Sequence, residues 1–422
     1  MLLLPYSVNI QALSASTANF INGSQPYLTF DGGVTKATTT EDLLGITLSD
    51  GTRITPATNT SSKENPIELP NLDASFTDIN MLVPPTTDHI ALSELIGAPN
   101  NYWGDDDGDG QGINGIKVTG SLSVNITDND DQTVGRDIKL NICKAPYKVV
   151  LTGTDGSLTT QYGTPNERTF KSSSATYYIN PKASPVICHA RPILEYGGGS
   201  YAGPADIWSP NNGFLIQSTS PSSYDLNFPT TGANNLYFDL MVGGSGPLTW
   251  PSVTLGGITA TMTPNASGNS VRVTLTGTTD ANKPDLPQTF ELIGYDSGGR
   301  AALKYGFVLK QWFIGAGNRN TSYYTLNSWC RGMGYRLPLV KELTNSTTRG
   351  AHYQRRIGAG FFTEWGNIEL YYDANFAKRH GQTNLYWTSE TTSVWYYTVY
   401  GVDGSLDQYT PYFNHTATCV YP

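Results

Sequence analysis

The acidic residues in the segment 103–112 have the spacing of a metal site. The segment reads WGDDDGDGQG, with Asp105, Asp107 and Asp109 at alternate positions and Gly110 directly after them. A hard cation such as calcium takes oxygen ligands at alternate positions of a loop, and a glycine at the sixth position allows the sharp bend. The sequence therefore predicts a calcium site at which these three carboxylates converge.

The full EF-hand pattern is absent from this loop. In a frame that begins at Asp105, Ile116 stands where an EF-hand places its bidentate Glu. A calcium site here would need carboxylates from elsewhere, and the candidates are Asp128, Asp130 and Asp131. The alternative is an acidic, solvated turn that binds no metal.

No catalytic motif accompanies this loop. The sequence contains no HExxH, P-loop, GxSxG elbow or GxGxxG with an acidic partner, and its five histidines are scattered. Arg336, Glu342 and Glu364 could suggest acid–base chemistry, but the sequence favours structural roles for them, in which Glu342 interacts with the helix dipole and Arg336 pairs with a carboxylate of the fold. We expect a protein that is not an enzyme. A carbohydrate-active enzyme stays open as an alternative, because the fold alone sets the two carboxylates of a glycosidase.

Length and composition limit the class of protein. A chain of 422 residues exceeds what one core usually holds, so two or three domains are expected. Only 14% of the residues are charged, and the 44 Gly and 25 Pro are typical of short strands joined by many turns. The net charge of -9, without a basic run interleaved with aromatics, argues against nucleic acid as a partner.

The sequence offers no membrane span. No segment has the roughly 18 consecutive apolar residues of a transmembrane helix. The N-terminal stretch MLLLPYSVNIQALSAS has an apolar start but no Lys or Arg before Lys36, so it supports a signal peptide only weakly. If the protein reaches a cell surface, we expect its exporter on another chain or on a longer form of this one.

The four cysteines are an even number without zinc-ligand spacing, so two disulfides in an oxidising compartment are expected. Three pairings are possible. The pairing that keeps each bridge within one region joins Cys143 to Cys188 and Cys330 to Cys419.

The middle of the chain has the alternating pattern of half-buried strands. Between about residues 115 and 305 the candidate strands are IKVTGSLSVNI, YKVVLTG, NLYFDLMVG, GGITATM, SVRVTLTG and QTFELIGY. Turn signals such as TDGS and YDSGG between them favour antiparallel hairpins. We therefore expect a mainly β protein with an N-terminal β arm or small β region over 1–100 and an antiparallel β-sandwich over 101–304.

The pattern changes after residue 304. The segment KYGFVLKQWF predicts a strand, and residues 321–334 predict a short helix ended by glycine. Pro338 suits the first turn of a second helix. The region 305–422 is therefore expected to be a separate α+β module, with a core of Trp329, Phe361, Phe362, Trp365, Trp387 and Trp395.

Three motifs in this region resemble C-type lectin-like modules of bacterial surface proteins. They are WCRGMGYRLPLVKEL at 329–343, YWTSE at 386–390 and the final cysteine in TCVYP. The resemblance implies an α+β fold with a long-range bridge between Cys330 and Cys419. Sulfatase-modifying oxidases share this fold, but their reactive cysteine pair would here be occupied by the bridge. EPN-, QPD- and WND-like triplets are absent from 305–422, so calcium-dependent sugar binding is not expected.

Other segments resemble the adhesion domain of invasin- and intimin-type adhesins of enterobacteria. They are NYWGDDDGDGQG, ICKAPYKV, ATYYINPKASPVICHARP, DLNFPTTGANNLYFDL and GAGFFTEWG. The resemblance covers about residues 70–422 and implies an extracellular, noncatalytic binding role at a bacterial cell surface. The expected partner is a host-cell surface protein or glycan.

The candidate receptor-binding residues are tyrosines of the C-terminal module, because tyrosine gives stiff, amphipathic contact area and is enriched at binding hot spots. They are Tyr371, Tyr372, Tyr396, Tyr397, Tyr409 and Tyr412. The alternative is a structural spacer or phage-borne fibre tip with no affinity of its own.

Overall fold

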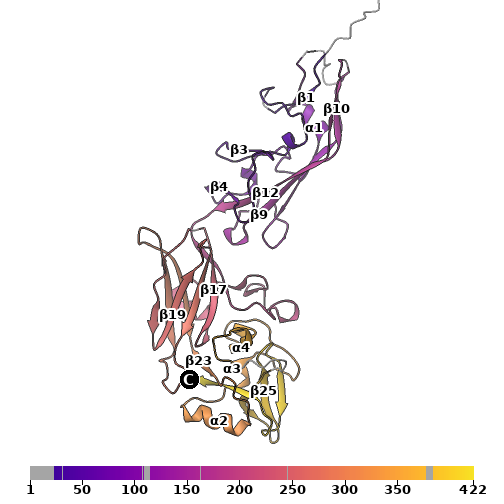
Figure 1. The fold of residues 1–422 in the computed structure, drawn as a ribbon. Helices are drawn as coiled ribbons and strands as arrows, with labels where there is room; N and C mark the ends of the chain where they lie inside the picture. The colour runs from indigo at the N-terminus through magenta and orange to yellow at the C-terminus, as the bar shows by residue number, and fades with distance from the viewer. Residues whose placement is uncertain are drawn as a thin grey trace, which may run out of the picture. The chain divides into compact units, whose positions relative to one another are not determined.

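The chain forms two compact units, which are Met1–Lys182 and Ala183–Pro422 (Figure 1). The computed structural model describes residues 23–30, 32–106, 108, 115–161, 163–244, 246–376 and 384–422. None of the described helices has the length and the apolar composition needed to cross a membrane.

The first unit is built on two sheets that share one hydrophobic core. The five-stranded sheet has the order β4 (Ile67–Leu72), β12 (Ser173–Lys182), β9 (Tyr147–Gly153), β8 (Ser121–Thr127) and β5 (His89–Ala91). The three-stranded sheet has the order β11 (Glu167–Phe170), β10 (Gly156–Thr159) and β7 (Lys117–Val118). Two short pairs, β1 (Tyr27–Leu28) with β6 (Trp103–Gly104) and β2 (Ile46–Thr47) with β3 (Arg53–Ile54), and the helix α1 (Leu92–Ile96) complete the unit.

The alternation of side chains explains why these strands form. In β8, Leu122, Val124 and Ile126 are buried, while the residues between them are not. Successive side chains of a strand point to opposite faces, so this spacing places all three in the core. Most neighbouring strands are antiparallel, and the exception in this sheet is β12 with β4.

The first half of the second unit is a sandwich of a seven-stranded sheet and a hairpin. The sheet has the order β14 (Trp208–Ser209), β15 (Gly213–Leu215), β13 (Val186–Arg191), β17 (Leu236–Gly243), β20 (Ser270–Thr276), β19 (Ile258–Pro264) and β18 (Val253–Leu255). The hairpin consists of β21 (Gln288–Tyr295) and β22 (Ala301–Leu309). Phe238 of the sheet and Phe290 and Phe307 of the hairpin belong to one buried cluster.

The C-terminal half of this unit is an α+β, C-type lectin-like module, as the sequence predicts. Its sheet has the order β16 (Thr231–Ala233), β23 (Gln311–Gly315), β27 (Thr416–Tyr421), β24 (Leu385–Thr391), β25 (Tyr396–Tyr400) and β26 (Leu406–Tyr409). Three helices accompany it, which are α2 (Tyr323–Gly332), α3 (Val340–Leu343) and α4 (Phe361–Trp365). The mainly β fold class with this C-terminal module is therefore confirmed.

The divisions of the chain differ from those drawn on the sequence. The boundary expected between residues 100 and 101 lies inside the first unit, because β5 before it and β8 after it pair in one sheet. The boundary expected after residue 304 lies inside β22. The single strand predicted for KYGFVLKQWF is two strands, since β22 ends at Leu309 and β23 begins at Gln311.

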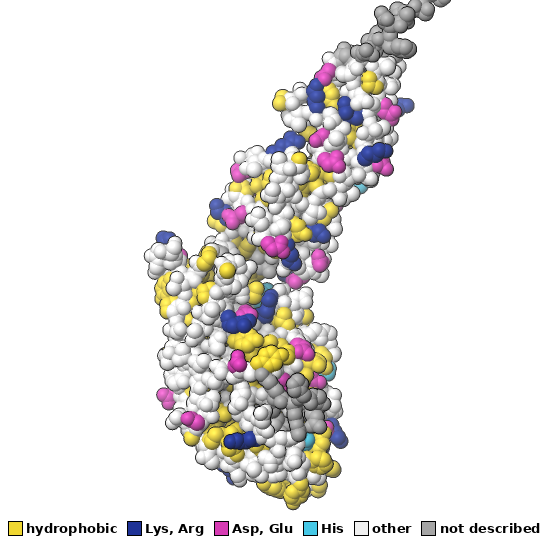
Figure 2. Space-filling view, viewed as in Figure 1, with side chains coloured by type: hydrophobic (Ala, Val, Ile, Leu, Met, Phe, Trp, Pro, Cys, Tyr) yellow, Lys and Arg dark blue, Asp and Glu magenta, His cyan; other side chains and the backbone are white. Residues whose placement is uncertain are grey.

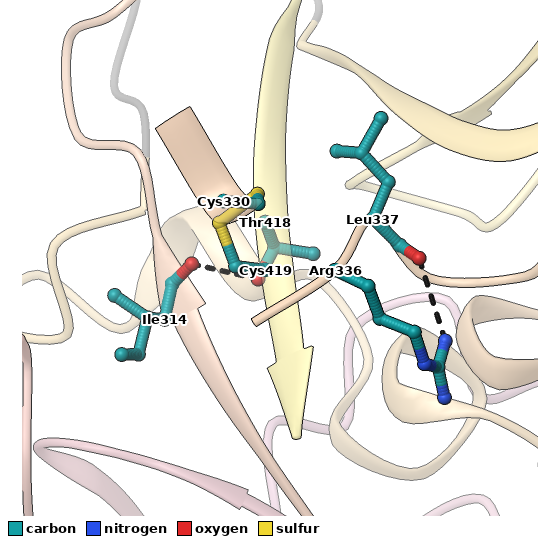
Figure 3. The surroundings of a disulfide bond; sticks show 6 residues. All are labelled: Ile314, Cys330, Arg336, Leu337, Thr418 and Cys419. Carbon is teal, nitrogen blue, oxygen red and sulfur yellow. Dashed lines mark hydrogen bonds between the residues drawn. A yellow bond between two sulfur atoms is a disulfide. The ribbon is translucent and has the colours of Figure 1, made fainter. Parts of the chain in front are cut away.

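A disulfide between Cys330 and Cys419 joins α2 to β27 (Figure 3), as predicted. Its Cα atoms are 5.4 Å apart. Beside it, the Thr418 hydroxyl donates to the carbonyl oxygen of Ile314 at 3.1 Å, which ties β27 to β23. Cys143 and Cys188 are disulfide-bonded as well. The described part of the chain holds no free cysteine.

Candidate functional site

Five aromatic side chains form an exposed surface on the lectin-like module, which we call the aromatic patch: Tyr324, Tyr396, Tyr409, Tyr412 and Phe413. Tyr324, Tyr412 and Phe413 are 50%, 77% and 53% exposed. The ring centroid of Tyr324 lies 6.2 Å from those of both Tyr396 and Tyr412, and the rings of Tyr409 and Phe413 are 5.4 Å apart. Tyr396 and Tyr409 are directly opposite each other on β25 and β26. Figure 2 shows hydrophobic side chains gathered at the end of the module that carries α2.

The helix α2 turns one member of the patch outward. Tyr323, Leu326 and Cys330 are buried, and their spacing of three and four residues places them on one face of the helix. Tyr324 follows Tyr323 directly and therefore lies off that face. The Cys330–Cys419 bridge ties the same buried face to β27, so the helix that carries Tyr324 is joined covalently to the sheet.

A second layer of rings supports the patch from below. The ring of Tyr323 lies 4.4 Å from that of Tyr396, and the buried ring of Trp387 lies 5.8 Å from Tyr323. His415 lies 4.9 Å from Trp387 and 4.4 Å from Tyr409. Close ring packing of this kind immobilises side chains, so the exposed rings present a rigid surface.

A paired acid, Asp407, lies near His415 beneath the patch. Burial lowers the pKa of His415 to about 4, although the nearby Asp407 acts in the opposite direction, so the imidazole is uncharged at neutral pH. Asp407 accepts a hydrogen bond from Arg349 Nε at 2.7 Å. Burial opposes the ionisation of Asp407, but the backbone N–H of Gln408 and the Arg349 guanidinium hold its pKa below the usual value. The patch is therefore an aromatic surface with a paired polar border.

A buried carboxylate anchors α4 to Thr230 and to the strand β16. Glu364 of α4 is fully buried and accepts hydrogen bonds from the hydroxyls of Thr230 and Thr231 at 2.8 and 2.6 Å. It also accepts from the backbone N–H groups of Thr230, Thr231 and Gly358. Burial raises the pKa of Glu364, and these hydrogen bonds offset part of that effect. With no solvent access, Glu364 is a structural residue, as the sequence suggested.

A buried guanidinium lies in the same anchor. Arg355 is fully buried and donates to the carbonyl oxygens of Glu195 and Glu364, both at 3.0 Å, and also to that of Ile193. Gly366 has a φ of +80°, and a Cβ there would come within 2.0 Å of the guanidinium, so only glycine fits. We call Glu364, Arg355 and their partners the junction.

One of the predicted binding tyrosines belongs to this junction, and its prediction was wrong. Tyr371 is 1% exposed. Its hydroxyl donates to the carbonyl oxygen of Trp365 at 3.1 Å and accepts from the backbone N–H of Ile193 at 3.0 Å. A side chain enclosed in this way contacts no receptor.

The other predicted tyrosines lie on different surfaces. Tyr396, Tyr409 and Tyr412 come together in the aromatic patch, whereas Tyr397 points to the opposite face of β25 because side chains alternate along a strand. Tyr372 is 66% exposed. Among the residues expected in the core, Phe361, Phe362, Trp365 and Trp387 are buried and Trp329 is half-buried, but Trp395 is 46% exposed because it lies in the turn before β25.

The predicted calcium ligands are described only in part. Asp105 is half-buried, and Asp107 and Asp109 lie outside the described residues. Of the additional carboxylates considered, Asp130 pairs with Lys144 at 3.2 Å, and Asp128 lies 3.7 Å from the same lysine. The described residues contain no cluster of three or more metal-ligating side chains. Calcium binding by this loop stays a prediction.

Two members of the patch, Tyr324 and Phe413, are not among the predicted binding residues. For Tyr324 the sequence predicts only a position in a helix, although the helical spacing of its buried neighbours places its side chain outward. Phe413 has no comparable signal, because it follows β26 in a loop without regular periodicity. Its position next to Tyr409 depends on the tertiary fold.

Part of this chain is similar in sequence to a bacterial adhesin. The inverse autotransporter adhesin YeeJ of Escherichia coli K12 is 30% identical over 110 residues, which are 24% of this chain and 4% of that protein. The match thus spans a small fraction of its length. No protein-family model matches the chain.

Solved structures also match this chain. Invasin, described as a bacterial integrin-binding protein, is 16% identical with a TM-score of 0.38 and covers 76% of this chain and 53% of its own. The C-terminal 282-residue fragment of intimin, solved with the intimin-binding domain of its translocated receptor, is 16% identical with a TM-score of 0.36. That match covers 72% of this chain and 93% of the fragment. The match to YeeJ confirms the resemblance to bacterial surface adhesins that the sequence motifs indicated.

Proposed function

We propose that this chain is the tip of a bacterial surface adhesin and that it binds a host-cell surface receptor noncovalently through the aromatic patch. The observation that carries the proposal is the exposure of rigidly supported rings at one end of the module. An exposed apolar surface of this kind on a polar protein commonly marks an interaction site. Tyrosine supplies much contact area there at a small cost in side-chain entropy.

Two further observations support this role. The Cys330–Cys419 bridge suits an extracellular location, because disulfides persist in oxidising compartments. YeeJ is an adhesin by name, invasin is described as an integrin-binding protein, and the intimin fragment was solved in complex with a domain of its receptor. A protein receptor is favoured over a glycan for the patch, since clustered, well-supported tyrosines are typical of protein hot spots.

Binding of the labelled full chain to cultured mammalian epithelial cells, measured by flow cytometry, tests the proposal. The double variant Tyr324→Ala/Tyr412→Ala is expected to bind at least about tenfold more weakly, because hot-spot truncations cost about 2 kcal/mol or more. Tyr372→Ala is the matched control, since it removes an exposed tyrosine outside the patch, and it should bind like the wild type. Protease treatment of the cells should abolish binding, whereas glycosidase treatment should leave it intact.

Two outcomes would contradict the proposal. If the full chain bound no cell surface, the adhesive role would be lost and a structural spacer would remain. If the double variant bound as tightly as the wild type, the receptor would contact a different face of the module.

A further inference from the structure

A groove on the opposite face of β25 has the features of a small-molecule site. Its apolar lining includes Val340, Leu406 and the ring of Tyr397, and Lys341, Thr347 and Glu390 supply polar groups. Its volume is about 610 Å³, within the roughly 300–1,000 Å³ that is usual for ligand pockets. Tyr397 lines this groove, and none of the aromatic patch residues does.

Several polar groups of the groove have no partner within the described chain. The Lys341 ammonium, the Thr347 hydroxyl and the Tyr397 phenol make no hydrogen bond or ion pair to any described residue. Glu390 accepts from the backbone N–H of Val340 at 3.1 Å through Oε2, and its Oε1 has no described partner. The groove therefore presents both donors and an acceptor to whatever enters it.

The other polar side chains of the lining are already used. The Thr344 hydroxyl donates to the carbonyl oxygen of Gly404 at 2.8 Å, and the Ser346 hydroxyl donates to that of Ala351 at 2.5 Å. These bonds hold the rim of the groove without competing for a ligand. A rigid rim with a few uncommitted polar groups is the usual design of a binding pocket.

The charges of the groove select among ligands. Lys341 and Glu390 carry opposite charges and, within the described chain, form no ion pair with each other. An ionic ligand would meet one attractive and one repulsive charge. A sugar hydroxyl both donates and accepts, so it can bond to an ammonium and a carboxylate at once. The C–H face of the sugar ring can pack against the ring of Tyr397.

From this combination we infer that the groove is a calcium-independent subsite for a neutral saccharide. It goes beyond the proposed function, because Tyr397 and the patch residue Tyr396 point to opposite faces of β25. The module would then have two binding surfaces, a protein-binding patch and a sugar-binding groove, that operate independently.

Saturation-transfer difference NMR on the full chain, in the presence of EDTA, tests the inference. The probes are the methyl glycosides of glucose, galactose, mannose, N-acetylglucosamine and N-acetylgalactosamine, and at least one is expected to receive saturation. Tyr397→Ala should weaken that binding about tenfold and Lys341→Met about threefold, in line with the loss of one ring contact or one hydrogen bond. Tyr397→Phe keeps the ring and should retain most of the affinity.

Controls separate this inference from the proposed function. Tyr412→Ala changes the patch and should leave the glycoside signal unchanged, whereas Lys341→Met should leave cell binding through the patch unchanged. Melting curves check that each variant is folded, and the exposed Lys341→Met carries the test if Tyr397→Ala is unstable.

Three results would overturn the inference. The first is the absence of a signal from every glycoside. The second is a signal that neither Tyr397→Ala nor Lys341→Met reduces. The third is binding of Nα-acetyl-lysine amide or Nα-acetyl-glutamate amide without any glycoside, which would assign the groove to a peptide side chain.

Discussion

The junction and the aromatic patch belong to the same unit, yet they are organised in opposite ways. In the junction, Glu364 and Arg355 are enclosed, and each is hydrogen-bonded to a backbone group of a segment distant in sequence, at Thr230 and at Glu195. In the patch, Tyr324 and Tyr412 are exposed, and the hydrogen bond between the hydroxyls of Tyr324 and Tyr396 at 3.2 Å joins two members of the surface itself.

This difference shows that the burial of a side chain, rather than its residue type, decides whether the side chain stabilises the fold or can contact a partner. Tyr371 and Tyr372 are neighbours in sequence, but Tyr371 is enclosed and Tyr372 is exposed. Enclosed polar groups must be paired and so contribute to stability, whereas exposed rings leave contact area for a partner. The contrast predicts that junction variants lose stability and that patch variants lose binding.

The largest effect is expected for Glu364→Ala. The substitution leaves the N–H groups of Thr230, Thr231 and Gly358 buried without an acceptor, which should lower the free energy of unfolding by about 3–5 kcal/mol. Urea denaturation of the full chain measures it. Asp206→Ala, at an exposed acid of the same unit, is the control and should change stability by less than about 0.5 kcal/mol. Equal effects of the two variants would show that the buried carboxylate of Glu364 contributes no more to stability than an exposed one.

The bridge beneath the patch is expected to contribute somewhat less. Cys330 and Cys419 are 89 residues apart, and removing a bridge that closes a long loop typically costs about 2–4 kcal/mol. The variant Cys330→Ala/Cys419→Ala should melt earlier and also bind cells more weakly, because α2 would no longer be tied to β27. Loss of stability with unchanged binding would show that ring packing alone positions the patch.

The His415 side chain adds a pH dependence to the patch. Its pKa in the folded protein is about 4, compared with 6.5 when unperturbed, so the unfolded chain binds the extra proton between these values. Stability should therefore be complete above pH 6.5 and fall as the pH drops toward 4. Solvent screening at this partly exposed ring leaves an effect of about 1–2 kcal/mol. In denaturation at pH 7 and pH 4.5, His415→Phe should flatten the profile, and a profile identical to that of the wild type would exclude this residue as the cause.

The predicted calcium loop belongs to the first unit, whereas the junction and the patch belong to the second. If the loop of Asp105, Asp107 and Asp109 binds the ion with the millimolar affinity of an extracellular module, 1 mM calcium should stabilise the chain by about 1 kcal/mol or less. Thermal melting with calcium and with EDTA measures the shift. Substituting the three residues by Asn should abolish it. Identical melting curves of the wild type in both buffers would contradict calcium binding by this loop.

The smallest change in stability is expected for the patch itself. Tyr324→Ala/Tyr412→Ala removes exposed rings, so unfolding should change by less than about 0.5 kcal/mol although cell binding falls. Denaturation and flow cytometry on the same preparation test both halves of the statement. A large loss of stability would show that the patch rings stabilise the fold as the junction residues do, which would contradict the prediction.

Local pattern predicted much of the secondary structure. The segment QTFELIGY is β21 residue for residue, and YKVVLTG is β9, because alternation of apolar and polar side chains is legible over a few positions. The helix expected over 321–334 is α2, whose buried residues show helical spacing. The split between β22 and β23 could not be predicted, since the apolar pattern continues across Lys310 and only the pairing partners differ.

The sequence by itself determined the mainly β class, the lectin-like motifs, the Cys330–Cys419 bridge and the presence of many tyrosines in the last hundred or so residues. Only the tertiary structure decided which of these tyrosines are exposed and can contact a partner. It enclosed Tyr371 against the sandwich, gathered Tyr396, Tyr409 and Tyr412 with Tyr324, and turned Tyr397 toward the groove. The physical reason is that the exposure of a side chain depends on which distant segments pack over it, and no local pattern carries that information.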